Sequence, residues 1–381
     1  MNERIPIFEA QRTMNQTVLE PSPSRSQEEV RLPDECSKEK EDLKNLGPRE
    51  LEAFVASYGK ERYRTTQILR WLYQKGVSSF DEMTNLSRTF REQLSREAAL
   101  SDLKLLTTRG APDGTKKFLF GLEDGNRIES VLIPEKDRLT LCVSTQVGCP
   151  LGCRFCLTGK KGWKRDLRSS EIINQILAVR RLLSPNKTIT NIVLMGMGEP
   201  LLNVVNTMRA VELMVHPDAF RFSSRRVTLS TAGVLPALEA LSKRKIPFRL
   251  AISLNAADDE TRSRLMPINR RYPMERLLAF CRNLRLPPRT RITFEYVLLE
   301  GVNDSPADAK RLLKLLRGIP SKVNLIPLNE APGIPFKRPS DERIETFQNV
   351  LIEGGLTAIV RASKGSEISA ACGQLQGEEE G

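Results

Sequence analysis

Residues 139–363 alternate between short apolar runs rich in Val, Ile, Leu and Thr and longer stretches with helical periodicity. The apolar runs have the length of strands, and the stretches between them, such as 169–183 and 340–355, have the length of helices. Alternation of this kind gives parallel strands covered by crossover helices. About six such units predict an α/β fold, an incomplete barrel of the partial (β/α)6 type. The runs are LTLCVST, NIVLMGMG, RVTLSTAG, FRLAISLNA, ITFEYVLLEG, KVNLIPLNE and a final LTAIVRAS.

The remainder of the chain differs in texture from this region. The N-terminal segment is polar, charged and rich in Ser, Pro and Glu, as disordered tails are. Three short helical patterns with basic outer faces follow, which favour either an RNA-contacting module or a plain packing domain. A hairpin is then predicted, with Asp124-Gly125 at its turn. We therefore divide the chain into a disordered tail at 1–42, a small helical RNA-contacting domain at 43–102, a β-hairpin extension at 103–138, the partial barrel at 139–355 and a C-terminal strand and loop carrying a cysteine at 356–381.

The chain is strongly basic, with 59 Lys and Arg against 47 Asp and Glu and a net charge of +12. Such an excess favours a polyanionic partner such as nucleic acid, although a solvated surface can have the same composition. Basic segments at 160–168, 220–226 and 242–249 are expected near the barrel mouth, where they would neutralise phosphates. The low aromatic content, 6%, favours structured RNA over a stacking platform for single strands.

No apolar run approaches the roughly 20 residues that cross a bilayer. The first residues also lack the apolar stretch of a signal peptide. We therefore expect a cytoplasmic protein without membrane contact, in which thiols stay reduced and closely spaced cysteines bind metal or react.

Four of the seven cysteines lie within fifteen positions: Cys142, and a trio formed by Cys149, Cys153 and Cys156. Three thiolates on one Gly-rich loop can hold three irons of a 4Fe–4S cluster and leave the fourth iron free for a substrate. A structural zinc site with Cys142 as fourth ligand is the alternative. The single histidine, His216, precedes a proline and is expected at the surface. We favour the cluster because polar and Gly-rich motifs follow the other strands, where barrels place their chemistry.

The trio, its position after the first barrel strand and GMGEP at the end of the next strand resemble the radical S-adenosylmethionine (SAM) superfamily. In that superfamily the open iron chelates the amino and carboxylate groups of SAM. An electron from the cluster cleaves the sulfonium and gives a 5′-deoxyadenosyl radical. LTLCVSTQVGCPLGCRFC, GMGEPLLN, RVTLSTAG, AISLNA, MPINRRYP and SEISAACGQL narrow the resemblance to the RlmN family of RNA methyltransferases, over about residues 44–376. Members methylate C2 of adenine, at adenosine 2503 of 23S rRNA and adenosine 37 of tRNA (RNA numbering).

The resemblance implies a route through a methylated cysteine that consumes two SAM molecules per turnover. The first SAM methylates Cys372. The radical from the second abstracts a hydrogen from the S-methyl group, and the resulting carbon radical adds to C2 and crosslinks protein to RNA. Cys142 then attacks the Cys372 sulfur, forms a disulfide and releases the product. On its residues alone, Cys142 would be interpreted as a buried apolar cysteine in a strand.

The resemblance also implies Glu129 as the proton acceptor at C2, because a proton must leave the methylated ring. The family more usually has His at the position of Asn255, and Asn can still donate and accept hydrogen bonds. The implied partners are 23S rRNA, tRNA and an electron donor such as flavodoxin or ferredoxin, and the protein is expected to be a monomer. A C8-methylating enzyme of the Cfr type and a non-catalytic, zinc-bearing RNA-binding protein are the alternatives. The implied SAM-binding residues are Gly198, Glu199, Ser230, Ser253, Leu254, Asn255 and Asn329.

Overall fold

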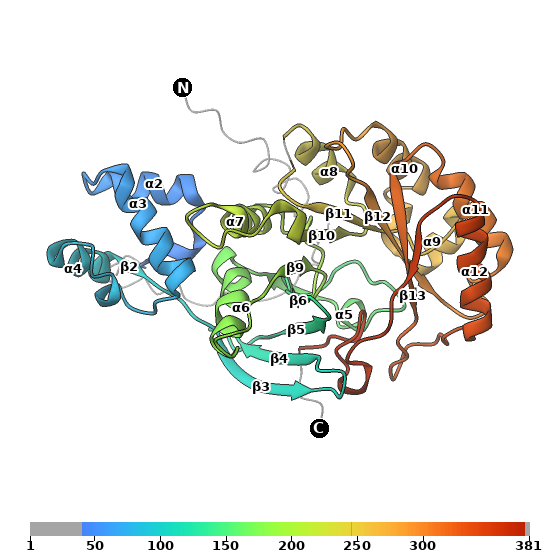
Figure 1. The fold of residues 1–381 in the computed structure, drawn as a ribbon, viewed down its shortest axis with the longest axis horizontal. Coiled ribbons are helices and arrows are strands. Elements are labelled where there is room, and N and C mark those ends of the chain that lie inside the picture. The colour runs from blue at the N-terminus through green and yellow to red at the C-terminus, as the bar shows by residue number, and fades with distance from the viewer. Residues whose placement is uncertain (1–39, 245, 378–381) are drawn as a thin grey trace, which may run out of the picture.

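The computed structural model describes residues 40–244 and 246–377. A ten-stranded sheet forms its centre, with the strand order β14-β13-β12-β11-β10-β9-β6-β5-β4-β3 (Figure 1). The first seven strands in this order run parallel to one another, which confirms the α/β partial barrel. They are β6 (Arg138–Cys142), β9 (Asn191–Leu194), β10 (Val227–Thr231), β11 (Arg249–Ser253), β12 (Ile292–Leu298), β13 (Ser321–Pro327) and β14 (Ala358–Val360).

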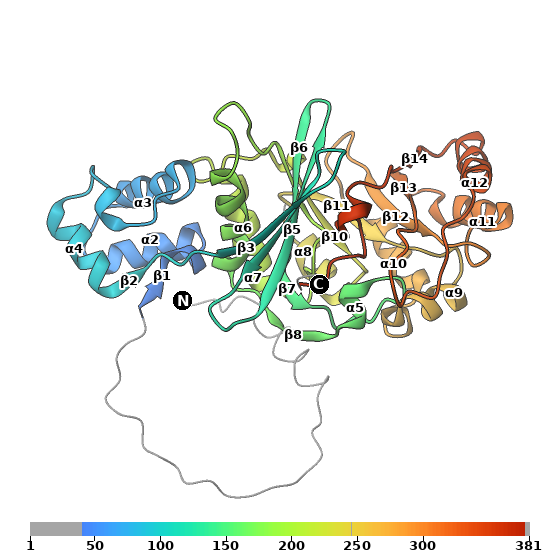
Figure 2. The ribbon, with the colours of Figure 1, turned by 90° about the horizontal axis from the view of Figure 1, so that it is seen from below.

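The predicted hairpin extension is a three-stranded continuation of the same sheet. Strands β4 (Lys116–Gly121) and β5 (Arg127–Glu135) form the expected antiparallel hairpin, with Gly125 at φ 80° in the turn. The additional strand, β3 (Lys104–Gly110), pairs with β4 at the sheet edge. The hairpin prediction missed β3 because no side chain of this strand is fully buried, so it lacks an apolar alternation. Figure 2 shows these strands between the N-terminal helices and the rest of the sheet.

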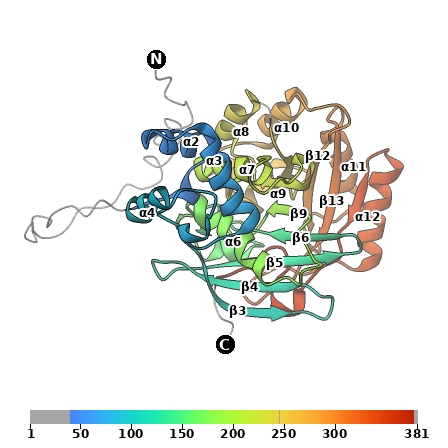
Figure 3. The ribbon, with the colours of Figure 1, turned by 60° about the vertical axis from the view of Figure 1, so that its left-hand side comes forward.

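Helices cover the outer side of the parallel strands, as crossover connections require. Figure 3 shows α11 and α12 outside β13. Shorter elements at the loops are α5 (Leu157–Lys160), β7 (Gln146–Gly148), β8 (Trp163–Asp166), η4 (Ser224–Arg226), α9 (Asp259–Leu265), η5 (Pro267–Arg270) and η6 (Ser366–Ile368). The outer helices are α6 (Ser169–Arg181), α7 (Val204–Val215), α8 (Leu235–Ser242), α10 (Met274–Asn283), α11 (Pro306–Leu316) and α12 (Asp341–Glu353).

The N-terminal helices form a module beside the sheet, drawn in blue in Figure 1. Its helices confirm the three helical patterns, and Ser87 caps the last one by accepting a hydrogen bond from Phe90 N. Lys44, buried under the module, donates to Asn174 of α6 and fixes it to the barrel. The elements are β1 (Glu41–Asp42), η1 (Leu43–Asn45), α2 (Pro48–Ser57), α3 (Arg62–Leu69), a π-helix η2 (Arg70–Lys75), η3 (Phe80–Glu82), α4 (Arg88–Glu97) and β2 (Ala98–Ala99).

The predicted boundary of the N-terminal tail at residue 42 is wrong. Glu41 and Asp42 pair with Ala98 and Ala99 as parallel strands. The Asp42 carboxylate accepts from the amides of Lys44 and Ser101, and these local bonds order the chain before the first helix. The remainder of the predicted tail, residues 1–39, lies outside the described residues.

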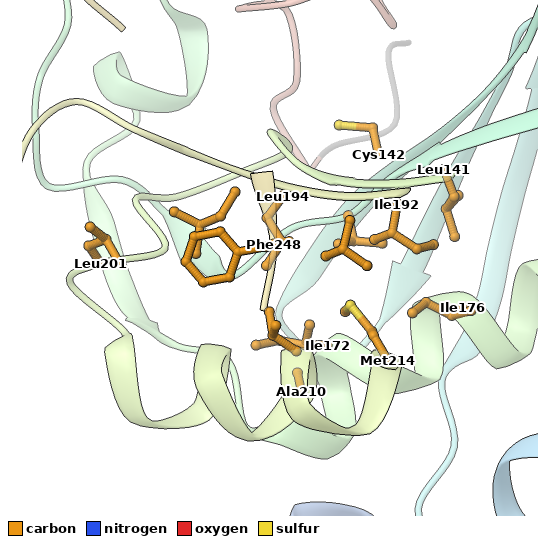
Figure 4. Packing of buried hydrophobic residues seen from close by; sticks show 14 of the residues in the cluster. Leu141, Cys142, Ile172, Ile176, Ile192, Leu194, Leu201, Ala210, Met214 and Phe248 are labelled. Atoms are coloured by element: carbon orange, nitrogen blue, oxygen red, sulfur yellow. The ribbon is translucent and has the colours of Figure 1, made fainter. Parts of the chain in front are cut away.

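Strand alternation sends neighbouring side chains of β6 to opposite sides of the sheet. Leu141 joins Ile192 of β9 and the α6 and α7 residues Ile176 and Met214 in the main core (Figure 4). The burial of each such side chain contributes about 1.5–3 kcal/mol. The next side chain, Cys142, points away from these helices to the interior side of the sheet (Figure 4). Packing of the outer face therefore determines that the thiol faces the interior of the barrel.

A membrane-spanning helix would need more length and apolarity than any helix within 40–244 and 246–377 has.

Candidate active site

The three cysteines of the trio lie on one loop after β7, which pairs with β8 in a small antiparallel sheet. Gly148 has φ 78°, and a Cβ at this position would lie 1.9 Å from the carbonyl oxygen of Gly162. That close approach lets the Cys149 amide donate a 2.8 Å hydrogen bond to Gly162. Only glycine allows both the left-handed conformation and this contact. The loop is therefore bent and fixed at the position where the first cysteine enters.

The trio thiols are partly buried and interact with one another electrostatically. Burial, with a smaller contribution from the neighbouring Cys156, raises the pKa of Cys149 to about 12. Burial and both neighbouring thiols raise the pKa of Cys153 as well. Within the described residues no three Cys, His, Asp or Glu side chains already surround a common point as metal ligands do. The donor set nevertheless fits a cluster, because three adjacent thiols that repel as anions are stabilised by a bound cationic metal.

The predicted SAM-binding residues follow successive parallel strands. Gly198 has φ 99°, and a Cβ would lie 2.5 Å from the Gln146 side chain, so only glycine allows the turn after β9 to pack this closely against Gln146. The buried Glu199 carboxylate accepts from the amides of Leu201 and Ala232, at 3.1 and 2.8 Å. Burial raises the pKa of Glu199, and these hydrogen bonds oppose the shift. Glu199 thus connects the end of β9 to the end of β10.

Asn255 uses its side chain within the protein. Its φ of 57° lies in the left-handed region, which Asn adopts more readily than most residues. Its Oδ1 accepts from the Val297 amide at 2.9 Å, and its Nδ2 lies 3.2 Å from the Met266 sulfur. Its backbone amide donates to Glu295 O at 3.3 Å, and its carbonyl oxygen accepts from Asn303 Nδ2 at 2.8 Å. A role toward SAM would therefore require a change of conformation at Asn255 or use the remaining lone pair of its carbonyl oxygen.

Four polar side chains occupy interior positions on adjacent strands. Ser253 lies opposite Glu295 in the β11–β12 register, and Glu295 lies opposite Asn324 in the β12–β13 register. The Glu295 carboxylate accepts hydrogen bonds from Asn324 and Ser230, and burial raises its pKa. Sequence reasoning missed Glu295, although a carboxylate inside the apolar run ITFEYVLL is an available signal.

The structure brings Cys142 and Cys372 together although 230 positions separate them in the sequence. Burial raises the pKa of the Cys142 thiol above its ordinary value, and the nearby Cys372 contributes. Cys372 is accessible to solvent, but the surrounding protein desolvates it and raises its pKa to about 11. The charges of Glu295 and Cys156 contribute to this rise, and the Arg361 charge opposes it. The outlying cysteine, the C-terminal cysteine and the trio therefore share one region.

The C-terminal segment returns from β14 across the barrel toward β4 (Figure 1). Asn329, a predicted SAM-binding residue, directs its Nδ2 to the Cys372 carbonyl oxygen at 3.3 Å. The Leu157 amide donates to Gly373 O, and Thr158 Oγ1 donates to Leu375 O, both at 2.7 Å. These bonds place the segment directly beside the end of the cysteine loop.

Glu129 is 1% exposed, unlike a typical strand glutamate that faces solvent. Its Oε1 lies 3.0 Å from Lys117 Nζ. Its Oε2 accepts from the backbone amides of Gln376 and Gly377, at 2.6 and 2.9 Å. The predicted proton acceptor thus contacts the C-terminal segment directly. Lys117 could not be identified from its position in the chain, because its role depends on the β4–β5 register.

Arg262 is a third functional candidate, after Glu295 and Lys117, that sequence reasoning missed. It is 1% exposed and donates to the carbonyl oxygens of Ala232, Ser253 and Leu254 and to Asn269 Oδ1. The guanidinium therefore ties together the ends of β10 and β11, where SAM-binding residues are predicted. Arginine is rarely fully buried, so neither composition nor periodicity indicates this position.

The predicted basic surface divides between the two ends of the barrel. Segment 160–168 includes β8 and lies beside the cysteine loop at the carboxyl ends of the strands. Segments 220–226 and 242–249 lead into β10 and β11, so their described residues, which do not include residue 245, lie at the opposite end. Their expected position at the barrel mouth is wrong, because a segment that precedes a parallel strand lies at its amino end.

Comparisons with known proteins agree with this geometry. Residues 41–100 match the family model of the ribosomal RNA large subunit methyltransferase N-terminal domain, and residues 143–313 match that of the radical SAM superfamily. The chain is 52% identical to the dual-specificity RNA methyltransferase RlmN of Geotalea uraniireducens (strain Rf4) over 339 residues, 89% of this chain and 97% of the relative. It is 52% identical to that of Geobacter sulfurreducens over 336 residues, 88% of this chain and 92% of the relative.

A solved structure has the same fold along almost the whole chain. The crystal structure of a radical SAM methyltransferase from Sphaerobacter thermophilus superimposes with a TM-score of 0.83 at 45% identity. The match covers 89% of this chain and 100% of that chain. The chain therefore belongs to the RlmN family of radical SAM RNA methyltransferases, as its motifs predicted, and its cofactors are a 4Fe–4S cluster and SAM.

Proposed function

We propose that this protein methylates C2 of adenine in RNA, at adenosine 2503 of 23S rRNA and adenosine 37 of tRNA, through a methylated cysteine and a transient disulfide. Family membership supports the RNA substrates, since the relatives are named dual-specificity RNA methyltransferases. The observation that carries the cysteine route is the convergence of Cys142, Cys372 and the trio in one region of the barrel. A non-catalytic RNA-binding protein would not require these five cysteines to lie in one region.

Cys149, Cys153 and Cys156 would hold the cluster, and Gly198, Glu199, Ser230, Ser253, Leu254, Asn255 and Asn329 would surround SAM. When bound, the cluster supplies the electron that cleaves SAM and so activates the S-methyl carbon. Ser230 and the ordered strand ends beside it provide polar groups inside an otherwise apolar barrel.

Cys372 acts as the methyl carrier. Its sulfur attacks the SAM methyl group, a new S–C bond forms, the sulfonium bond breaks and the thiol proton leaves. The exposure of Cys372 supports this role, because a carrier must meet both SAM and RNA. Its raised pKa of about 11 means that the reactive thiolate forms only when an acceptor removes its proton.

Cys142 acts as the resolving thiol and Glu129 as the proton acceptor. Glu129 takes the proton that leaves C2, with Lys117 as the counter-charge for the buried carboxylate, and the unpaired electron of the adduct would return to the oxidised cluster. Cys142 then attacks the Cys372 sulfur and forms a disulfide. The sulfur–carbon bond breaks, and the carbon left on C2 takes a proton to become the methyl group. A dithiol reductant restores both thiols.

RNA would bind over the carboxyl ends of the barrel strands. Segment 160–168 contributes exposed Lys160, Lys161, Lys164 and Arg168 beside the cysteine loop, where they can neutralise phosphates. The target adenine must leave its stack to reach Cys372. The six cysteines of the described residues are all free thiols, which supports a reducing, cytoplasmic setting. We further propose that the protein acts as a monomer and takes electrons from a flavodoxin- or ferredoxin-type donor.

Nucleoside profiling of RNA from cells with and without the protein tests this proposal. Loss of 2-methyladenosine from both 23S rRNA and tRNA is the expected result of deletion. Loss of 8-methyladenosine instead would assign the C8 activity. Unchanged nucleosides, together with a colourless purified protein that contains stoichiometric zinc, would identify a binding protein without catalysis.

A further inference from the structure

A buried ion pair joins two neighbouring strands of the hairpin extension. Lys117 of β4 and Glu129 of β5 are 5% and 1% exposed, and their Nζ and Oε1 atoms are 3.0 Å apart. They lie diagonally across the strands, since Leu119 is the residue opposite Glu129. Burial of two charges is costly unless further hydrogen bonds satisfy the remaining donors and lone pairs. The partners that provide those bonds therefore indicate what the pair is for.

Both members of the pair bind the C-terminal segment. Lys117 Nζ donates to the Ser369 carbonyl oxygen at 3.3 Å, and Glu129 Oε2 accepts from the amides of Gln376 and Gly377. These contacts lie three positions before Cys372 and four and five positions after it. The cation thus holds the beginning of the Cys372 loop by a carbonyl, and the anion holds its end by two amides.

We propose that Lys117 is a positioning residue for methyl transfer: the Lys117–Glu129 pair fixes both ends of the loop that carries Cys372. This inference rests on the proposed carrier role of Cys372. It also gives Glu129 a task before any RNA reacts, separate from proton acceptance at C2. An ionised carboxylate has about four lone pairs, so the three donors seen at Glu129 leave one for a proton.

Other contacts hold the middle of the loop, but they cannot replace the pair. Asn329 and Leu157 bind the carbonyls of Cys372 and Gly373, and Thr158 binds that of Leu375. None of these three hydrogen bonds involves Ser369, Gln376 or Gly377, and all three are made by uncharged donors. Hydrogen bonds to charged groups are roughly twice as strong as neutral ones, so the ends of the loop are its most firmly held points. Loss of either charge should let the loop, and with it the Cys372 sulfur, depart from its place beside SAM.

The first half-reaction distinguishes the positioning role of the Lys117–Glu129 pair from the role of Glu129 as a base. Methylation of Cys372 by SAM involves no adenine, so a glutamate that serves only as base has no effect on it. We expect Lys117→Met and Glu129→Gln to slow Cys372 methylation about 10- to 100-fold in RNA-free, cluster-loaded enzyme. Lys117→Arg should restore most of the rate, because it keeps the cation. Lys116→Met, on the exposed side of the same strand, is the matched control and should match the wild type.

The readout is the mass of the C-terminal tryptic peptide that begins at Gly365, in which Cys372 is the only cysteine. Hydrogen exchange of the full-length protein supplies an independent measurement. In Glu129→Gln, the segment containing Gln376 and Gly377 should exchange about tenfold faster, because its amides lose a charged acceptor. Thermal unfolding of each variant confirms that it is folded, and the near-isosteric Glu129→Gln decides the case if Lys117→Met does not fold.

Each outcome bears on one claim. Slow Cys372 methylation together with faster exchange supports the positioning role. Wild-type methylation in Glu129→Gln and Lys117→Met overturns it, whether or not exchange changes, and leaves Glu129 as a base alone. If the wild-type enzyme itself never methylates Cys372, the carrier route fails instead. In that case the exchange measurement still shows whether the pair holds the loop.

Discussion

The backbone amide of Leu157 donates a 2.7 Å hydrogen bond to the carbonyl oxygen of Gly373. Leu157 directly follows Cys156, the last cysteine of the trio, and Gly373 directly follows Cys372. A backbone bond therefore fixes the C-terminal loop to the cysteine loop at the residues next to both thiols. Because main-chain atoms form it, side-chain substitutions in either loop leave it in place. Thiol variants can thus be interpreted as chemical changes at a preserved site.

Replacement of Cys372 by alanine should abolish RNA methylation, because no methyl carrier remains. Cys372 is an exposed residue on a loop although its thiol is desolvated by its neighbours, so the free energy of unfolding should change by no more than about 1 kcal/mol. Iron content and the visible spectrum of reconstituted protein should match those of the wild type. Cys281→Ala, on α10 outside the barrel, is the control that removes a thiol and keeps activity. Residual methylation in Cys372→Ala would contradict the carrier role.

Replacement of Cys142 by alanine should stop the reaction one step later. Cys372 can still accept a methyl group and attack RNA, but no thiol releases the product, so protein and RNA remain covalently joined. Denaturing electrophoresis should show a slow band that collapses on nuclease treatment. The double variant Cys142→Ala/Cys372→Ala should show no such band. Free methylated RNA at normal turnover from Cys142→Ala would refute the resolving role.

The parallel sheet could be predicted because strands buried on both faces are continuous apolar runs bounded by turn residues. The same reasoning fails for β3, whose side chains are exposed or only partly buried at the sheet edge. It also fails for the location of the basic segments. Their charge is evident in the sequence. Segments 220–226 and 242–249, however, precede β10 and β11, and a segment that precedes a parallel strand lies at its amino end, away from the barrel mouth.

Within the site, the trio could be found from spacing alone, since adjacent thiols on a glycine-rich loop have few other uses. The roles of Cys142 and Cys372 came from the family resemblance, because 230 positions separate them and no periodicity connects them. Lys117 and Arg262 could not be found. Both are charged residues whose burial depends on a tertiary partner, a strand register in one case and converging strand ends in the other.

Gly148→Ala should disrupt the cysteine loop. The alanine Cβ would lie 1.9 Å from Gly162 O, and φ 78° is unfavourable for any residue with a side chain. Because β7 would have to move away from β8, the free energy of unfolding should fall by about 2 kcal/mol or more. Iron incorporation should fall in parallel, measured per folded protein after reconstitution. Gly152→Ala is the comparison, because its Cβ meets nothing within 4 Å and only the conformational strain remains. Equal iron content in both variants would exclude the steric explanation.

His216 should titrate below the ordinary histidine pKa of 6.5, because partial burial lowers its pKa more than the Asp218 charge raises it. Its Nδ1 accepts a hydrogen bond from the Asp218 amide, which requires that nitrogen to be unprotonated. The folded state therefore binds fewer protons than the unfolded state near pH 6. Stability from this group is complete above pH 6.5 and is lost as the pH falls through the unfolded pKa toward the folded value.

Because the chain has one histidine, a single imidazole resonance reports this titration by NMR. His216→Asn retains an acceptor oxygen but no titration, so its stability should depend less on pH between 7 and 5. A measured His216 pKa at or above 6.5 would show that the Asp218 charge outweighs burial.

Arg262→Lys should weaken SAM binding although residue 262 is not predicted to contact SAM. The guanidinium donates to three carbonyl oxygens at the ends of β10 and β11, at 2.7 to 3.1 Å, and to Asn269. Lysine keeps the charge but cannot reproduce this planar set of donors. Each buried acceptor left without a donor costs about 1–3 kcal/mol. The variant should therefore lose about 2–4 kcal/mol of stability and about tenfold or more in SAM affinity, as Ser253 and Leu254 shift.

Arg264→Lys, exposed on the same helix α9, is the control and should change neither the stability nor the SAM affinity. Denaturant unfolding and equilibrium SAM binding to the reconstituted protein measure both effects. Reduced stability with unaltered SAM affinity would limit Arg262 to the fold and separate it from the binding of SAM.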